Sequence, residues 1–114
     1  RPATAGATIN YRIAGALYQA LVRACPSGID IYFENVGGPI LDAVLRLLNP
    51  FARISLCGMI SQYNLDPPEP GPRSLFSLIG SRALMPGFII SDHFGRYPEF
   101  LAEVGPWVKA GRLQ

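Results

Sequence analysis

The chain has 114 residues, enough for one small domain, and 49% of them are hydrophobic, so a packed core can form. The net charge at pH 7 is only +2 and the arginines stand apart, which argues against a nucleic-acid surface. No apolar run is long enough to span a membrane, and Arg1 opens no signal-peptide pattern.

Cysteine usage indicates the redox compartment. Cys25 and Cys57 are far apart in the sequence and lack metal-ligand spacing. Two free thiols in a reducing, cytoplasmic compartment are therefore expected, although a disulfide between them remains an alternative.

The first quarter of the chain predicts two small elements. Residues 1–5 have no pattern, and residues 7–9 predict a minimal strand that ends before Tyr11. Apolar residues at helical spacing predict a helix over residues 14–24. The sequence Cys-Pro-Ser-Gly at 25–28 ends that helix.

A strand–helix–strand unit follows and organises the rest of the chain. Ile29–Phe33 is rich in β-branched and aromatic residues, which is typical of a buried strand. Gly37 and Gly38 permit a tight turn, and Pro39 suits the first turn of a helix.

The helical part of this unit has an apolar stripe. Its members recur at helical spacing and are Ile40, Leu41, Val44, Leu45, Leu47 and Leu48. Asn49 and Pro50 are expected to stop the helix, and residues 52–57 predict a second strand. Strands joined by a helical crossover are parallel neighbours, so their carboxyl ends form the edge where ligands bind.

The last part of the chain predicts a loop, two helices and a strand. Residues 65–72 contain four prolines and predict an extended loop. A short helix is expected over 75–82 and an amphipathic helix over 97–110. Residues 84–90 predict a strand, in which Pro86 favours an edge position or a bulge.

A glycine-rich Gly-x-Gly-x-x-Gly turn is missing from these residues. A dinucleotide-binding fold needs such a turn to hold the pyrophosphate on backbone N–H groups. We therefore expect an incomplete nucleotide-binding unit rather than a whole one.

Several strings, in the right order, resemble one family. They are Ile-Asn-Tyr-Arg at 9–12, Asp-Ile-Tyr-Phe-Glu-Asn-Val-Gly-Gly at 30–38, Leu-Asn-Pro-Phe-Ala-Arg-Ile at 48–54, Cys-Gly-Met-Ile-Ser-Gln-Tyr-Asn at 57–64, Gly-Phe-Ile-Ile-Ser-Asp-His-Phe at 87–94 and Tyr-Pro-Glu-Phe at 97–100. The chain resembles the zinc-independent branch of the medium-chain dehydrogenase/reductase superfamily. Within it, the match is to the leukotriene B4 12-hydroxydehydrogenase, prostaglandin reductase, curcumin reductase and 2-alkenal reductase group.

This resemblance implies an α/β fold, the C-terminal part of a Rossmann-type NAD(P)-binding domain. Residues 6–114 would then lack the first two strands and the glycine-rich loop of that domain. The implied cofactor is NADP and the implied substrate is an α,β-unsaturated carbonyl compound. The full-length protein would be a homodimer paired through residues 84–90, whereas the isolated chain would be inactive.

The resemblance also implies the site residues. The cofactor-binding set is Tyr11, Asn35, Cys57, Gly58, Met59, Ile60, Ser61, Tyr63, Phe88, Ile89 and Ile90. Tyr63 is the implied catalytic residue, because a phenol O–H can hydrogen-bond the enolate oxygen that forms when hydride reaches the β-carbon.

Each of these residues has a structural alternative. Tyr11 could be an ordinary half-buried tyrosine, Asn35 a turn residue and Tyr63 a loop anchor. Residues 88–90 could simply be a buried strand. Cys57 is a poor nucleophile candidate without a nearby base, and the single histidine, His93, predicts no metal site.

Two other functions remain open at this point. One is a quinone or alcohol oxidoreductase of the same superfamily, against which the string at 61–64 argues. The other is a non-catalytic dimerisation module, because an apolar strand at a sheet edge is a template for pairing.

Overall fold

The computed structural model describes residues 6–12 and 16–113. The chain divides into two compact units, Gly6–Phe88 and a second unit that includes residues 89–113. The unmatched residues 1–5 and the expected start of the first helix at residue 14 lie outside the described residues.

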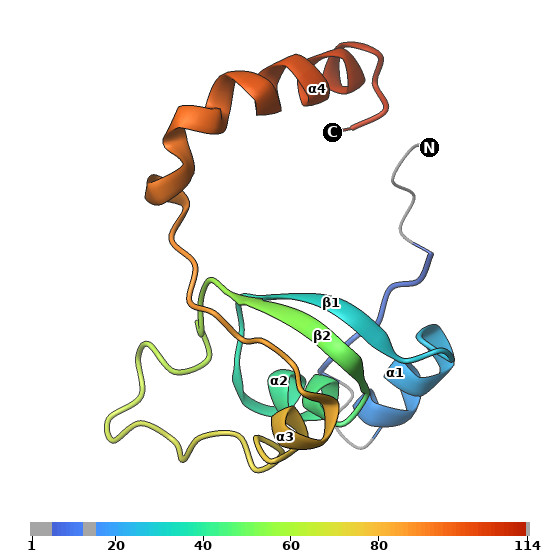
Figure 1. The fold of residues 1–114 in the computed structure, drawn as a ribbon, viewed down its shortest axis with the longest axis vertical. Coiled ribbons are helices and arrows are strands. Elements are labelled where there is room, and N and C mark those ends of the chain that lie inside the picture. Colours follow the sequence, from blue (N-terminus) through green and yellow to red (C-terminus); the bar gives the residue numbers. More distant parts are fainter. Residues whose placement is uncertain (1–5, 13–15, 114) are drawn as a thin grey trace. The chain divides into compact units, whose positions relative to one another are not determined.

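The larger unit contains the predicted strand–helix–strand arrangement. Helix α1 (Leu17–Ala24) leads into strand β1 (Ile29–Glu34), helix α2 (Gly38–Leu45) and strand β2 (Leu48–Leu56). β1 and β2 pair in parallel, which confirms the predicted helical crossover (Figure 1). The predicted fold class, an α/β piece with parallel strands and flanking helices, is therefore confirmed.

One face of this two-stranded sheet is covered and the other is open. Figure 1 shows α2 and α3 (Ser77–Ser81) on the same side of the strands. The core there is formed by Leu41, Leu45 and Ile54. On the other face Ile31 is 68% exposed and Phe33 is 52% exposed. An apolar sheet face normally packs against a further layer, so this face can accept one.

The boundary between α2 and β2 differs from the prediction. α2 ends at Leu45, and Leu48, expected on the helical stripe, begins β2. Ile29 pairs with Leu48, but Ile31 already pairs with Arg53, so extra residues of β2 bulge out between them. Phe51 lies in this bulge with φ 63°. Asn49 and Pro50 therefore interrupt the ladder rather than end the helix, because a bulge tolerates a proline.

The predicted strand over residues 7–9 is wrong, since these residues belong to no strand or bridge. A strand exists through hydrogen bonds to a neighbour. Within residues 6–12 and 16–113, β1 and β2 pair only with each other and with the 84–87 segment, so residues 7–9 join no sheet there.

The predicted strand over 84–90 is present only as two parallel bridges, Arg53 to Leu84 and Leu56 to Gly87. The Leu84 and Phe88 amides donate to Ala52 and Leu56 of β2, and the Pro86 carbonyl accepts from the Leu56 amide. Pro86 has no N–H to donate, so the ladder is interrupted at that residue. The segment lies beside β2, at the edge that the proline had indicated.

Between β2 and the 84–87 segment, the helix is shorter than predicted and the loop is as predicted. α3 covers Ser77–Ser81 rather than residues 75–82. Residues 65–72 form no helix or strand, which confirms the predicted loop.

The described part of the second unit is mainly helical. A 3-10 helix, Ile90–Arg96, precedes α4, Tyr97–Lys109. Ile90 therefore begins a helical turn rather than ending a strand. None of the helices among residues 6–12 and 16–113 has the length and apolar character needed to cross a membrane.

Candidate site at the carboxyl edge of the sheet

Two loops leave the carboxyl ends of β1 and β2 and are bonded to each other. The Glu34 carbonyl accepts from the Cys57 amide at 2.9 Å and from the Gly58 amide at 3.0 Å. The Asn35 carbonyl accepts from Ile60 at 3.1 Å. These backbone bonds hold the 35–38 loop alongside the 57–61 loop, which is the arrangement that the parallel strands predict.

Glycines make this close approach possible. Gly37 and Gly38 have φ of 75° and 58°, a region that residues with a Cβ rarely adopt. A Cβ at Gly37 would lie 3.1 Å from Met59 Cε and 3.3 Å from Ser61 Oγ. The two glycines therefore allow both the turn and the contact with the second loop.

Tyr63 folds back over the second loop. The Met59 amide donates to the Tyr63 phenol oxygen at 2.9 Å, and a Cβ at Gly58 would lie 2.9 Å from that oxygen. The same Cβ would lie 3.3 Å from the Asn35 carbonyl oxygen, so Tyr63 and Asn35 flank Gly58. Because the oxygen only accepts this bond, the phenol retains its own proton for donation.

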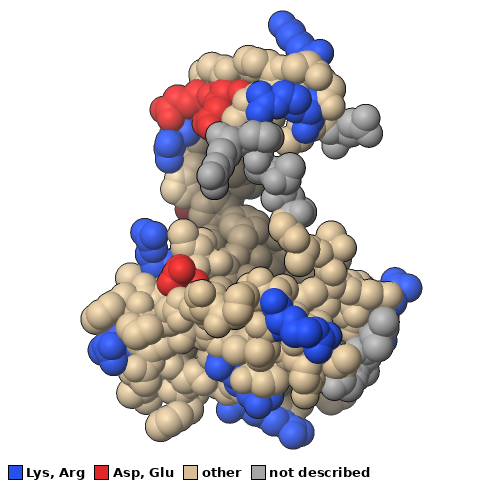
Figure 2. Space-filling model, turned by 90° about the vertical axis from the view of Figure 1, so that its right-hand side faces the viewer, with Lys and Arg blue, Asp and Glu red and all other residues tan. Residues whose placement is uncertain are grey.

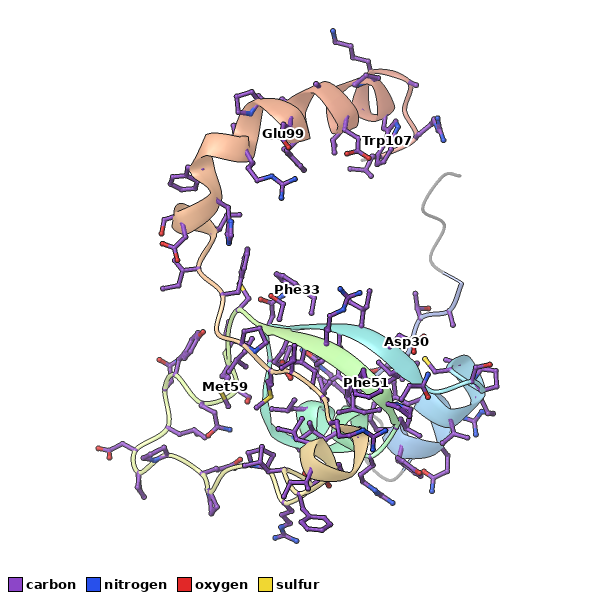
Figure 3. The ribbon with its side chains drawn as sticks, viewed as in Figure 1. Asp30, Phe33, Phe51, Met59, Glu99 and Trp107 are labelled. Atoms are coloured by element: carbon purple, nitrogen blue, oxygen red, sulfur yellow. The ribbon has the colours of Figure 1, made fainter. Side chains whose placement is uncertain are left out.

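Tyr63 and Asn35 are both accessible. Tyr63 is 65% exposed and the Asn35 side chain is exposed as well. Figure 3 shows Met59 and Asp30 at opposite ends of the strands, which locates these loops at one end of the sheet.

The buried carboxylate of Glu34 lies beneath the first loop. Glu34 is 0% exposed, and its Oε1 accepts from the Val36 amide and, at 2.7 Å, from the Gly37 amide. Burial, and then the negative charge of Glu34, raises the pKa of the Tyr32 phenol above its usual value.

A cavity of about 510 Å³, within the usual size range of small-molecule sites, adjoins the second loop. It is bounded by the amino end of α2, the 59–62 turn and the proline-rich loop. The side chains that give it character are Pro39, Asp42, Met59, Gln62, Glu69 and Arg73. Asp42 already accepts from the Ser74 amide at 2.7 Å, which ties the far end of the proline-rich loop to α2.

The structure brings together only part of the predicted cofactor-binding set. Asn35 and the 57–63 residues share one edge, as the bonds above show. Tyr11 lies in an exposed turn, in which the Arg12 amide donates to Asn10 Oδ1. Phe88 packs edge-on against Phe33, with ring centroids 5.9 Å apart. Ile89 and Ile90 belong to the second unit.

Sequence reasoning missed Glu34, which was given no part in the site. The signal is present in the sequence: an acidic residue stands at the end of a strand, two and three residues before the amides of Val36 and Gly37. Asp and Asn side chains commonly accept from the turn amides that follow them, and the Glu34 carboxylate does the same on a longer side chain.

Residues 6–12 and 16–113 contain neither a cluster of metal-ligating side chains nor a disulfide. No group of three or more His, Cys, Asp or Glu side chains there could hold a metal ion. Cys25 and Cys57 are both free, as predicted.

Figure 2 shows basic side chains dispersed over the visible face, in keeping with the scattered arginines of the sequence.

No protein-family model matches the chain. Individual proteins do. A 2-alkenal reductase (NADP(+)-dependent) from Nicotiana tabacum is 51% identical over 104 residues, which are 91% of this chain and 30% of that protein. The NADPH-dependent curcumin reductase of Escherichia coli is 48% identical over 100 residues, 83% of this chain and 29% of its own length.

A solved structure gives the same result. The crystal structure of CurA from Vibrio vulnificus in complex with NADPH superimposes with a TM-score of 0.79 and 45% identity, over 93% of this chain and 33% of that protein. This chain therefore spans only about a third of the length of these relatives. The chain belongs to the prostaglandin reductase, curcumin reductase and 2-alkenal reductase group of the medium-chain dehydrogenase/reductase superfamily.

Proposed function

We propose that these residues are part of an NADPH-dependent reductase that acts on the C=C bond of α,β-unsaturated carbonyl compounds. Residues 6–114 would form the C-terminal part of its nucleotide-binding domain, without the first two strands and the glycine-rich loop. The observation that carries this proposal is the carboxyl edge, where Tyr63 and Asn35 flank Gly58 on two bonded loops.

The residues at this edge fit a nicotinamide nucleotide. The Asn35 amide is exposed, and the Ser61 hydroxyl lies beside the Gly37–Gly38 turn, so donors and acceptors for ribose and carboxamide are close together. Gly58 presents backbone without a side chain next to them. Such an edge can receive the reactive end of a dinucleotide, while Tyr11 would bind the adenosine phosphate elsewhere in this unit. Cys57, Met59, Ile60, Phe88, Ile89 and Ile90 would supply backbone and apolar contacts.

Tyr63 is the residue proposed to act on the substrate. NADPH, when bound, supplies the hydride. The Met59 amide fixes the phenol oxygen, and the phenol proton can then be donated to the carbonyl oxygen of an enone as negative charge develops there. Tyr63 is thus proposed as a hydrogen-bond donor that stabilises the enolate.

The proposal implies that residues 1–114 alone have no turnover. The pyrophosphate of a dinucleotide needs backbone amides at a glycine-rich turn, which this sequence does not contain. An enone-dependent oxidation of NADPH by the isolated chain would contradict this part of the proposal.

The decisive experiment is a steady-state assay of the full-length protein that carries these residues. NADPH oxidation is measured with a cyclic enone, an alkenal, a quinone and an aldehyde, and repeated with NADH. We expect the enone and the alkenal to be reduced, with a preference for NADPH. Tyr63→Phe should lower kcat by about 10- to 100-fold, since water and the cofactor ribose can share proton delivery.

The outcomes separate the alternatives. Turnover of the quinone or the aldehyde alone would favour another oxidoreductase of the superfamily. No turnover at all, combined with a dimer by light scattering, would favour an assembly module. The proposed homodimer is tested by the same light-scattering measurement on the active protein.

A further inference from the structure

Glu34 occupies a position that the proposed chemistry does not use. It is the last residue of β1 and is fully buried, yet it carries a carboxylate. Oε1 accepts from the amides of Val36 and Gly37. Oε2 is buried, and the Tyr32 phenol is a polar neighbour of the carboxylate. Burying a carboxylate is costly unless its hydrogen bonds repay the cost.

The backbone of the same residue serves the other loop. The Glu34 carbonyl accepts from the amides of both Cys57 and Gly58. One residue therefore anchors the 35–38 loop through its side chain and the 57–61 loop through its main chain. No other described residue is bonded to both loops through its side chain and its carbonyl in this way.

We propose that Glu34 is a positioning residue: its buried carboxylate fixes the Val36 and Gly37 amides relative to the strand end, and thereby sets the spacing between Asn35 and Tyr63 across Gly58. The proposal rests on the proposed function for its effect on cofactor binding, but the loop geometry can be tested without a cofactor.

The geometry favours positioning over a general contribution to the fold. Gly37 has φ 75° and ψ −158°, a conformation found almost only in glycine, which the chain leaves easily unless it is held. The Glu34 carboxylate bonds the Gly37 amide and so holds this residue directly. The hydrogen bonds that the carboxylate accepts come from the Val36 and Gly37 amides and not from the core residues Leu41, Leu45 and Ile54.

The test compares three variants of the full-length protein. Glu34→Gln keeps the shape and removes the charge, Glu34→Asp keeps the charge and shortens the side chain, and Asp30→Asn removes an exposed carboxylate at the other end of the same strand. The measurements are the Kd for NADPH and hydrogen exchange of the amides of residues 36, 37, 57 and 58 without NADPH.

We expect Glu34→Gln to raise the Kd and to speed amide exchange at Val36 and Gly37, each by about tenfold, because hydrogen bonds to a charged acceptor are roughly twice as strong as neutral ones. Glu34→Asp should restore both to within about threefold, because a shorter carboxylate also accepts from the second and third following amides. Asp30→Asn should leave both unchanged.

Three results would overturn the proposal. One is a lower Tm in Glu34→Gln with unchanged Kd and unchanged exchange, which would make Glu34 a structural residue only. Another is an equal rise in the Kd and in the amide exchange rates in Asp30→Asn. The third applies if the variants fail to fold: it is exchange of the Val36 and Gly37 amides in the unmodified protein as fast as that of the Glu69 amide in the exposed 65–72 loop. If the unmodified protein does not bind NADPH, the proposed function is refuted. The exchange data would still test whether Glu34 holds the two loops in place.

Discussion

The two ends of the β1–β2 pair are both tied across the strands, but by different means. At the amino end the exposed Asn49 amide donates to the Ser27 carbonyl at 2.9 Å and to Asp30 Oδ1 at 2.8 Å. At the carboxyl end the ties are backbone bonds and the buried carboxylate of Glu34. At the amino end the polar side chains of Asn49 and Asp30 are bonded to each other, whereas at the carboxyl end Asn35 and Tyr63 are accessible to a ligand.

This contrast supports the proposal that the polar groups at the carboxyl end, rather than those at the amino end, bind a ligand. The two bonds that Asn49 donates use both of its side-chain N–H donors, whereas the Tyr63 hydroxyl keeps its proton. A loop held by its own backbone can present its side chains outward. The following predictions test this difference, in order of decreasing effect.

Gly28→Ala should destabilise the protein by about 2–4 kcal/mol, from backbone strain and lost Asn49 bonds together. Gly28 has φ 82°, and a Cβ there would lie 2.1 Å from Asn49 Oδ1. Urea unfolding measures the change. In an Asn49→Ala background the same substitution should cost only the strain, about 1–2 kcal/mol. An equal cost in both backgrounds would show that Asn49 is not the obstacle.

Tyr32→Phe should remove a pH dependence at the carboxyl end. The folded protein holds the phenol proton after the unfolded chain has lost it, because burial and Glu34 raise the pKa of Tyr32. Stability is therefore complete below the unfolded pKa of about 10 and falls above it by about 1.4 kcal/mol per pH unit. Unfolding free energies measured from neutral to alkaline pH should show this slope less steep by that amount in Tyr32→Phe. Identical slopes in the two proteins would contradict the prediction.

Asn49→Ala should cost about 1 kcal/mol, since the two lost bonds are solvent-exposed. The Kd for NADPH should not change, because Asn49 lies at the end of the sheet away from the site. A weaker affinity for NADPH in this variant would break the proposed separation of the two ends.

Tyr63→Phe should change stability least, by about 0.5 kcal/mol, because the Met59 amide can bond to water once the phenol oxygen is gone. Thermal unfolding checks this value, and the assay described above checks activity. A large drop in stability would mean that Tyr63 anchors its loop, the structural alternative raised by the sequence.

The sequence predicted the elements whose patterns are local. The apolar strand at Ile29, the two glycines before Pro39 and the parallel crossover all follow from residue type and spacing. The bulge of β2 could not be predicted, because Leu47 and Leu48 continue the helical stripe and only the pairing with β1 decides where the strand begins.

Long-range partners decided the remaining differences. Residues 7–9 have strand-forming side chains but pair with no strand among the described residues, and Ile90 begins a 3-10 helix directly after the extended Ile89. At the site, the bond between Tyr63 and the Met59 amide and the role of Glu34 depend on where the loops meet, which no local pattern specifies.

The proline beside β2 has one more consequence. Residues 84, 86 and 88 direct their peptide groups toward β2, so Pro86 removes a donor on the inner side only. Met85 and Gly87 direct theirs outward, and both have an N–H and a carbonyl. The outer rim of this segment therefore keeps the alternating donors and acceptors that an added strand requires. A proline one residue earlier or later would have removed an N–H from that outer rim. At position 86 the proline leaves the rim able to pair with another strand, so it does not prevent self-association.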